Sequence, residues 1–182
     1  MTITELTQKI EYRASKTKLL YWLLLQYYRD VIKKEITLAD ITSDDHILCI
    51  GGGNCPFSAI LFHRATGAKV TVIDNISDCA AKAREVISRL GLDGYVRVFN
   101  EDGCSADLGG YTVVHFAMQV APMDTVFAAV EKSAAPGTKL LIRRPKKCLS
   151  KLYSRLIPAY ERYIAHKKAR NIGVTMMYVK QF

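Results

Sequence analysis

The sequence predicts an α/β fold built on a doubly wound, mostly parallel sheet, and three observations support this prediction. Short apolar runs typical of buried strands alternate with longer segments whose apolar residues recur every three or four positions. Glycine, proline and capping residues separate the two kinds of segment. A length of 182 residues, 49% of them hydrophobic, suffices for one domain with a sizeable core.

The chain starts with a helical pattern and then alternates between strands and helices. Residues 3–35 contain no glycine or proline and have apolar side chains at helical spacing. We expect an N-terminal helical cap over residues 1–45 and the α/β domain over residues 46–182. Strands are predicted at residues 47–50, 69–73, 95–99, 111–117, 139–143 and 174–179. A basic helix is predicted at 149–168, and the alternation implies helices on both faces of the sheet.

A glycine-rich turn in residues 47–60, ILCIGGGNCPFSAI, joins the first strand to a helix. Gly51 and Gly53 can take a positive φ and carry no Cβ, so the backbone can turn sharply and lie close to a ligand. Pro56 suits the first position of the helix. Tight packing of strand against helix explains such a turn as well as cofactor binding does. The candidate cofactor-binding residues in the turn are Gly51, Gly52, Gly53, Asn54 and Cys55.

The second strand ends in Asp74, 23 residues after Gly51. An acidic residue about 20 residues beyond such a turn hydrogen-bonds to ribose hydroxyls, which favours a nucleoside site over simple packing. Ligands of open parallel sheets bind beyond the carboxyl ends of the strands. Asp102 follows the third strand and could accept a hydrogen bond from an adenine amine, although an exposed turn residue is the alternative. The other candidates at this edge are Asn75, Gly103 and Ala117.

The positive charge is concentrated near the C-terminus. Residues 139–182 contain 12 Lys or Arg and a single acid, Glu161, whereas residues 1–138 contain 14 basic and 16 acidic residues. Such a segment attracts an acidic acceptor or partner, although a solvated helix face is the simpler explanation. Neither zinc-finger spacing nor an aromatic-glycine RNA-binding signature is present, so we expect no nucleic acid partner.

The cysteines and the apolar runs indicate the compartment. Five cysteines without paired spacing are typical of a reduced thiol set, so we expect a cytoplasmic protein. Residues 19–25 form an apolar run of seven, far short of a membrane span, and we expect no membrane association. The same helix carries Tyr21, Trp22, Tyr27 and Tyr28, more aromatic surface than one small face can bury. We expect it to form a homodimer contact or a lid.

The order of these features resembles the Rossmann-like S-adenosylmethionine-dependent methyltransferases. Over residues 45–143 the chain has the glycine turn, Asp74, the acidic turn at Asp102 and APG before the fifth strand. It departs at Cys49 and Cys55, where those enzymes usually carry an acid and a glycine. Nicotianamine synthases depart similarly, and the chain is similar to them in GGGNCP, YTVVHFAMQVAPM, APGTKLLIR and NIGVTMMYVK. The segment before the first strand is shorter here than the helical domain that precedes it in the nicotianamine synthases.

This resemblance implies a transferase that uses S-adenosylmethionine, most simply a methyltransferase with a small-molecule acceptor. Resemblance to nicotianamine synthases implies instead that the aminocarboxypropyl arm of the cofactor is transferred to an amine. Either transfer requires the cofactor to be held and a nucleophile to be aimed in line. A nucleoside-binding or partner-binding domain without turnover is the non-enzymatic alternative. The carboxylates of Asp74 and Asp102 argue against this alternative, because a domain that serves only as a scaffold has no physical need for carboxylates around one crevice.

A catalytic base is harder to assign from the sequence. His115, near the end of the fourth strand, is the best candidate, with Tyr12, Tyr111 and Glu101 behind it. A lone histidine is more often a structural residue. We expect no metal site, because the residues that could form one lack ligand spacing: Cys55, Cys104, His63 and His115.

Overall fold

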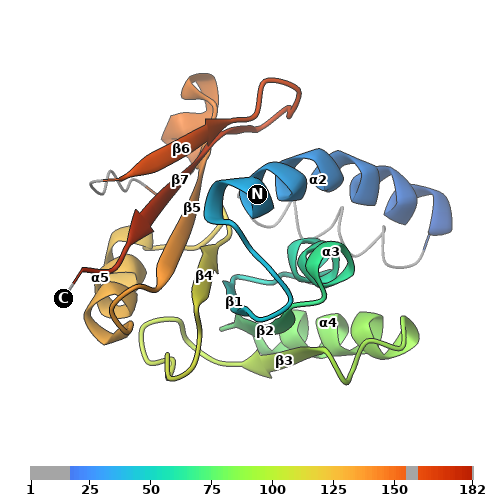
Figure 1. The fold of residues 1–182 in the computed structure, drawn as a ribbon. Coiled ribbons are helices and arrows are strands. Elements are labelled where there is room, and N and C mark those ends of the chain that lie inside the picture. The colour runs from blue at the N-terminus through green and yellow to red at the C-terminus, as the bar shows by residue number, and fades with distance from the viewer. Residues whose placement is uncertain (1–16, 155–159, 182) are drawn as a thin grey trace.

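The computed structural model describes residues 17–154 and 160–181. Its centre is a seven-stranded sheet with the strand order β3-β2-β1-β4-β5-β7-β6 (Figure 1). Neighbouring strands from β3 to β5 are parallel, whereas β7 runs antiparallel to both β5 and β6. The predicted α/β fold with a mostly parallel sheet is therefore confirmed.

Most elements lie close to the predicted segments. The strands are β1 His46–Ile50, β2 Lys69–Asp74, β3 Val96–Asn100, β4 Val113–Phe116, β5 Lys139–Pro145, β6 Arg162–Ala165 and β7 Ile172–Val179. The helices are α2 Lys18–Ala39, α3 Phe57–Thr66, α4 Ser77–Arg89, α5 Met123–Ser133 and the short 3-10 helix η1 Lys147–Leu152. Gly67 ends α3 with a left-handed φ of 80°, as glycine commonly does at the end of a helix.

Helices cover the two faces of the sheet unequally. Helices α2, α3 and α4 lie on one face and α5 lies on the other (Figure 1). Ile60 and Phe62 belong to the core beneath the three helices, whereas Phe116 and Phe127 belong to the core beneath α5. Between β3 and β4 the described chain forms a loop instead of a helix, and buried Leu108 covers the sheet there.

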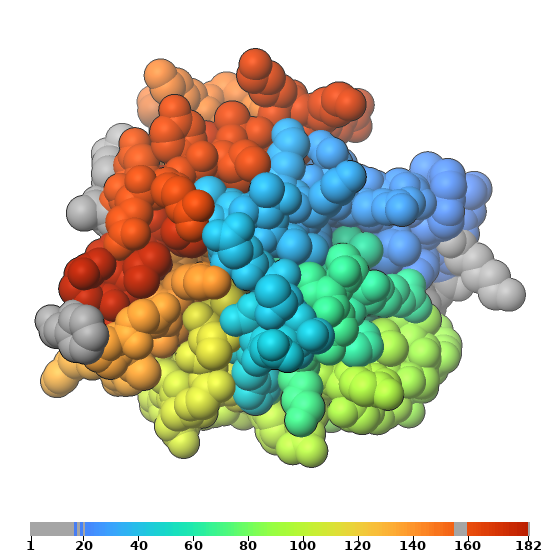
Figure 2. Space-filling model, in the orientation of Figure 1, coloured from blue at the N-terminus to red at the C-terminus, as the bar shows by residue number. Residues whose placement is uncertain are grey.

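Helix α2 is packed into the domain and reaches Ala39, beyond the predicted end at residue 35. Val31 and Ile32 are buried, and the helix contacts α3 and the β6–β7 hairpin (Figure 2). Its first turns are different: Leu19, Trp22 and Leu23 are 67%, 53% and 50% exposed. The predicted start of this helix lies outside the described residues. No helix in the described residues is long and apolar enough to cross a membrane.

The predicted basic helix over residues 149–168 is wrong. Its first part forms the end of η1, and residues 162–165 form β6, which pairs with β7. The side chains of β6 are exposed or partly exposed, so this edge strand lacks the apolar alternation that marks a strand in a sequence. Pairing with β7 determines its conformation instead.

Candidate cofactor site and a neighbouring basic cleft

The glycine turn lies at the carboxyl end of β1 and is held against β2. Gly51 and Gly53 have positive φ angles of 83° and 62°. A Cβ on Gly52 would lie 2.2 Å from the side chain of Val72 on β2. The close approach at Gly52 supports the packing explanation, while Gly51 and Gly53 form the turn itself. Helix α3 starts one residue later than predicted, with Pro56 as its N-cap.

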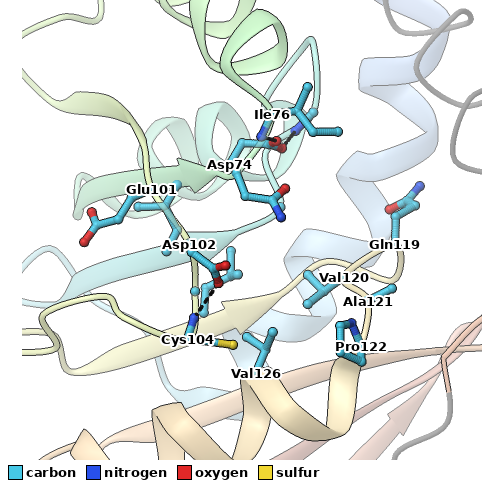
Figure 3. Close-up of a pocket in the computed structure, with 16 residues that line it drawn as sticks. Asp74, Ile76, Glu101, Asp102, Cys104, Gln119, Val120, Ala121, Pro122 and Val126 are labelled. Carbon is cyan, nitrogen blue, oxygen red and sulfur yellow. Dashed lines mark hydrogen bonds between the residues drawn. The ribbon is translucent and has the colours of Figure 1, made fainter.

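Asp74 lies at the end of β2, where its carboxylate connects two turns (Figure 3). Its Oδ2 accepts a hydrogen bond from the Gly53 N–H at 2.8 Å, and its Oδ1 accepts one from the Ile76 N–H at 3.0 Å. A carboxylate offers about four acceptor positions, so the oriented oxygens can accept further hydrogen bonds from a ligand. The N-cap of α4, which begins at Ser77, is Ile76.

The acidic turn after β3 is tied to the end of β2. The Asn100 side-chain amide and the Glu101 N–H both donate to the Asp74 carbonyl, at 2.8 and 3.1 Å. Asp102 orders the turn itself, since its Oδ1 accepts a hydrogen bond from the Cys104 N–H at 2.8 Å. This arrangement brings Asp74 and Asp102 to the same cavity (Figure 3).

A cavity of about 420 Å³ opens at this edge of the sheet, a size typical of small-molecule sites. Opposite the acidic turn, its wall is the segment 119–122 that follows β4 (Figure 3). The predicted residues that line it are Gly51, Gly53, Asp74, Asn75, Asp102 and Gly103. Sequence reasoning missed Ile76, Gln119, Val120, Pro122 and Val126. Ile76 follows β2, and Gln119, Val120 and Pro122 follow β4, so their position in the chain was the available signal, whereas Val126 lies within α5.

The remaining predicted cofactor residues lie beside this cavity. Gly52, Cys55 and Ala117 line a smaller cavity of about 40 Å³ together with Tyr28. Asn54 is buried and lines neither. Gly51 and Gln119 line both cavities, so the small one adjoins the large one at the glycine turn.

His115 is not delivered to the large cavity. It is fully buried on the face of β4 that packs against Phe62 of α3, and it lines only the small cavity. Burial and the charge of Arg143 lower the pKa of His115 to about 3. A general base works best with a pKa near the working pH. The burial and the low pKa of His115 therefore give its predicted catalytic role little support. Of the other candidates, Tyr111 packs on His46, Glu101 lines the large cavity and Tyr12 lies outside the described residues.

A buried ion pair that the sequence did not reveal connects α2 to β5. The Arg143 guanidinium donates two hydrogen bonds to the Glu35 carboxylate, from Nε and Nη2, both at 2.7 Å. The Thr175 hydroxyl lies 2.6 Å from the same carboxylate. Burial alone would raise the pKa of Glu35, but the charge and hydrogen bonds of Arg143 outweigh it and lower the pKa to about 2. The carboxylate is therefore ionised at neutral pH.

A second large cavity of about 610 Å³, here called the basic cleft, lies between β5, η1 and the β6–β7 hairpin. Arg143 lines both the basic cleft and the small cavity. Among the described residues that line the cleft none is acidic, and the charged ones are Arg143, Arg144, Lys146, Lys147 and Lys167. The predicted basic segment therefore contributes charge to a concave surface.

Comparison with known proteins identifies the fold. No protein-family model matches the chain, and no curated protein matches it. Among solved structures, a variant of the nicotianamine synthase MtNAS is 21% identical, over 98% of this chain and 71% of that one, with a TM-score of 0.84. Its complex with S-adenosylmethionine is 21% identical over 97% and 74%, also with a TM-score of 0.84.

A solved structure with a lower TM-score has the same type of fold. An RNA methyltransferase from Salinibacter ruber, in complex with S-adenosyl-L-homocysteine, is 19% identical over 84% of this chain and 91% of that one, with a TM-score of 0.66. The chain thus has the Rossmann-like fold of S-adenosylmethionine-dependent methyltransferases. Within that class, it shares the fold of a nicotianamine synthase over almost its whole length.

Proposed function

We propose that this protein is an S-adenosylmethionine-dependent transferase that binds its cofactor in the large cavity. The observation that carries the proposal is the oriented carboxylate of Asp74, which lines the cavity beside the glycine turn. Its remaining acceptor positions suit the two ribose hydroxyls. Asp102 suits the adenine amine, and Ile76 and Val126 offer apolar surface to the adenine ring.

The other end of the cofactor would lie at the glycine turn. There the start of α3 favours the negative carboxylate of the methionine part. The solved structures of this fold include complexes with S-adenosylmethionine and S-adenosyl-L-homocysteine, which agrees with this assignment. The sulfonium would then face Gln119, where the large cavity adjoins the small one.

Two group transfers are open to a bound sulfonium. We propose methyl transfer to a small molecule, in which the nucleophile bonds to the methyl carbon while the carbon–sulfur bond electrons remain on sulfur. Transfer of the aminocarboxypropyl arm to an amine is the second candidate. The extensive likeness to MtNAS favours it, since that protein has also been solved with MTA and tNA, with a TM-score of 0.82.

An assay of the nucleoside product distinguishes these transfers. Incubation with labelled S-adenosylmethionine and a small-molecule extract should release S-adenosylhomocysteine for methyl transfer, or methylthioadenosine for aminocarboxypropyl transfer. If the acceptor is acidic, as the basic cleft suggests, its KM should rise with ionic strength while that of the cofactor changes less. Release of neither nucleoside above the level of an Asp74→Ala control would contradict the transferase proposal.

We also propose a homodimer formed through the first turns of α2. Trp22 and Leu23 are half exposed there, and a neighbouring subunit would cover this apolar surface. The full chain should sediment as a dimer and Trp22→Lys as a monomer, whereas Leu152→Lys, a change at another exposed apolar residue, should leave the dimer intact. A monomeric full chain would contradict the proposal.

The cysteines support a proposed location in the cytoplasm. No disulfide joins them in the described residues, which include all five, and two of them, Cys104 and Cys148, are exposed. Exposed free thiols persist where the surroundings are reducing. An accessible-thiol count on protein taken directly from cells should therefore find both residues reduced.

A further inference from the structure

The basic cleft has a buried polar residue that the cofactor site does not use. His166 follows β6 directly, is 2% exposed and lines the cleft. Its N–H donates to the Gly173 carbonyl at 2.9 Å, and its carbonyl accepts from the Ala169 N–H at 3.1 Å. Its ring Nε2 lies 2.8 Å from the Thr175 hydroxyl oxygen. The position of the ring is therefore fixed from both the backbone and the side chain.

The hydrogen bonds that link His166 Nε2 to Thr175 and Thr175 to Glu35 determine the tautomer of the ring. The ionised Glu35 carboxylate can only accept, so the Thr175 hydroxyl must give its proton to Glu35. The Thr175 oxygen can then only accept from His166, which requires a proton on Nε2. In a neutral imidazole the other nitrogen, Nδ1, is left with a lone pair. Burial lowers the pKa of His166, which favours this neutral form.

This lone pair is unsatisfied within the described part of the chain. Among the residues that the structure describes, Nδ1 of His166 has no hydrogen-bond partner although the atom is buried. Leaving a buried acceptor unpaired is unfavourable, and native proteins satisfy nearly all such groups with protein, water or ligand. A ligand in the cleft that the ring lines would remove this cost.

We infer that the basic cleft is the acceptor site and that Nδ1 of His166 accepts a hydrogen bond from an N–H or O–H group of an anionic small molecule held there. This inference rests on the proposed function, because it assigns the cleft to the acceptor of the proposed transfer. Arg144, Lys146, Lys147 and Lys167 attract the negative groups of the ligand. Met118, Met123 and Ile142 supply apolar surface for its carbon skeleton. The ligand class is thus an amino or hydroxy acid.

Two probes that differ in one group test the inference without any cofactor. Aspartate and succinate both carry two carboxylates, but only aspartate has an N–H donor. Side-chain ¹⁵N NMR of the full chain should show His166 protonated at Nε2. Aspartate should shift the Nδ1 signal of His166, succinate should leave it nearly unchanged, and neither should affect the ring of His46, which lies outside the cleft.

Two substitutions distinguish the roles of the two nitrogens of the His166 ring. His166→Gln keeps a donor for Thr175 but lacks the Nδ1 acceptor, and it should weaken aspartate binding by about 10-fold or more while changing succinate binding little. His166→Asn keeps an acceptor near the Nδ1 position and should retain more of the aspartate affinity. Lys146→Gln should weaken both probes alike.

Several results would overturn the inference. These are a proton on Nδ1 of His166 in the free protein, equal effects of both probes on that nitrogen, or no binding of either probe at millimolar concentration. Each is measured on the unmodified chain, so a variant that fails to fold does not obscure the answer. Because no cofactor is present, these outcomes are independent of whether S-adenosylmethionine binds.

Discussion

Replacement of Arg143 by methionine should lower the free energy of unfolding by about 3–5 kcal/mol. The substitution removes the guanidinium that donates two hydrogen bonds to Glu35, whose side chain is fully buried. The carboxylate is then left in the core without a counter-charge, which costs far more than the loss of an ordinary contact. Urea denaturation followed by circular dichroism measures the change.

A matched control separates burial from charge. Arg162 forms an ion pair with Asp40 at 3.3 Å, but both side chains are more than half exposed. Exposed pairs of this kind are worth under about 1 kcal/mol, so Arg162→Met should change stability little. The double substitution Glu35→Leu and Arg143→Met should recover much of the loss, because no unpaired charge remains. If Arg143→Met cost no more than the control, the pair would not matter for stability.

The second large effect is expected at Asp74. Asp74→Ala should weaken S-adenosylmethionine binding by about 10- to 100-fold, the range for losing a hydrogen bond to a charged group. The loss has two sources, because the carboxylate would contact the ribose and also holds the N–H groups of Gly53 and Ile76 in place. Calorimetric titration of the cofactor measures the change.

An acidic residue outside the cavity provides the comparison for this prediction. Asp78 lies in the first turn of α4, where it pairs with Lys82 on the surface. Asp78→Asn removes the same charge and should leave cofactor affinity unchanged. A folded Asp74→Ala protein that binds as tightly as the unmodified chain would remove the ribose assignment.

The cofactor residues could be predicted because their signals are local in the sequence. Gly51 and Gly53 occupy positions where a positive φ is required, and Asp74 ends the next strand at a known offset. Parallel strands then bring Asp102 to the same edge without any further information. Gln119 and Pro122 were missed since they reach the cavity through a loop, where residue type carries no periodic pattern.

The interior polar residues could not be predicted, because they depend on tertiary contacts. Glu35 and Arg143 lie 108 positions apart and meet only when α2 packs across β5. His115 seemed close to the cavity because it is near the end of its strand, but alternation of side chains turned it toward α3. His166 was placed in a helix by composition, whereas pairing of β6 with β7 sets its actual position.

A crystal structure of the protein with S-adenosylmethionine tests the central claim most directly. The account predicts adenosine density in the large cavity, with ribose hydroxyls within hydrogen-bonding distance of the Asp74 carboxylate and the methionine part against residues 51–55. Cofactor bound only in the basic cleft, or a cavity that stays empty at saturating cofactor, would contradict it.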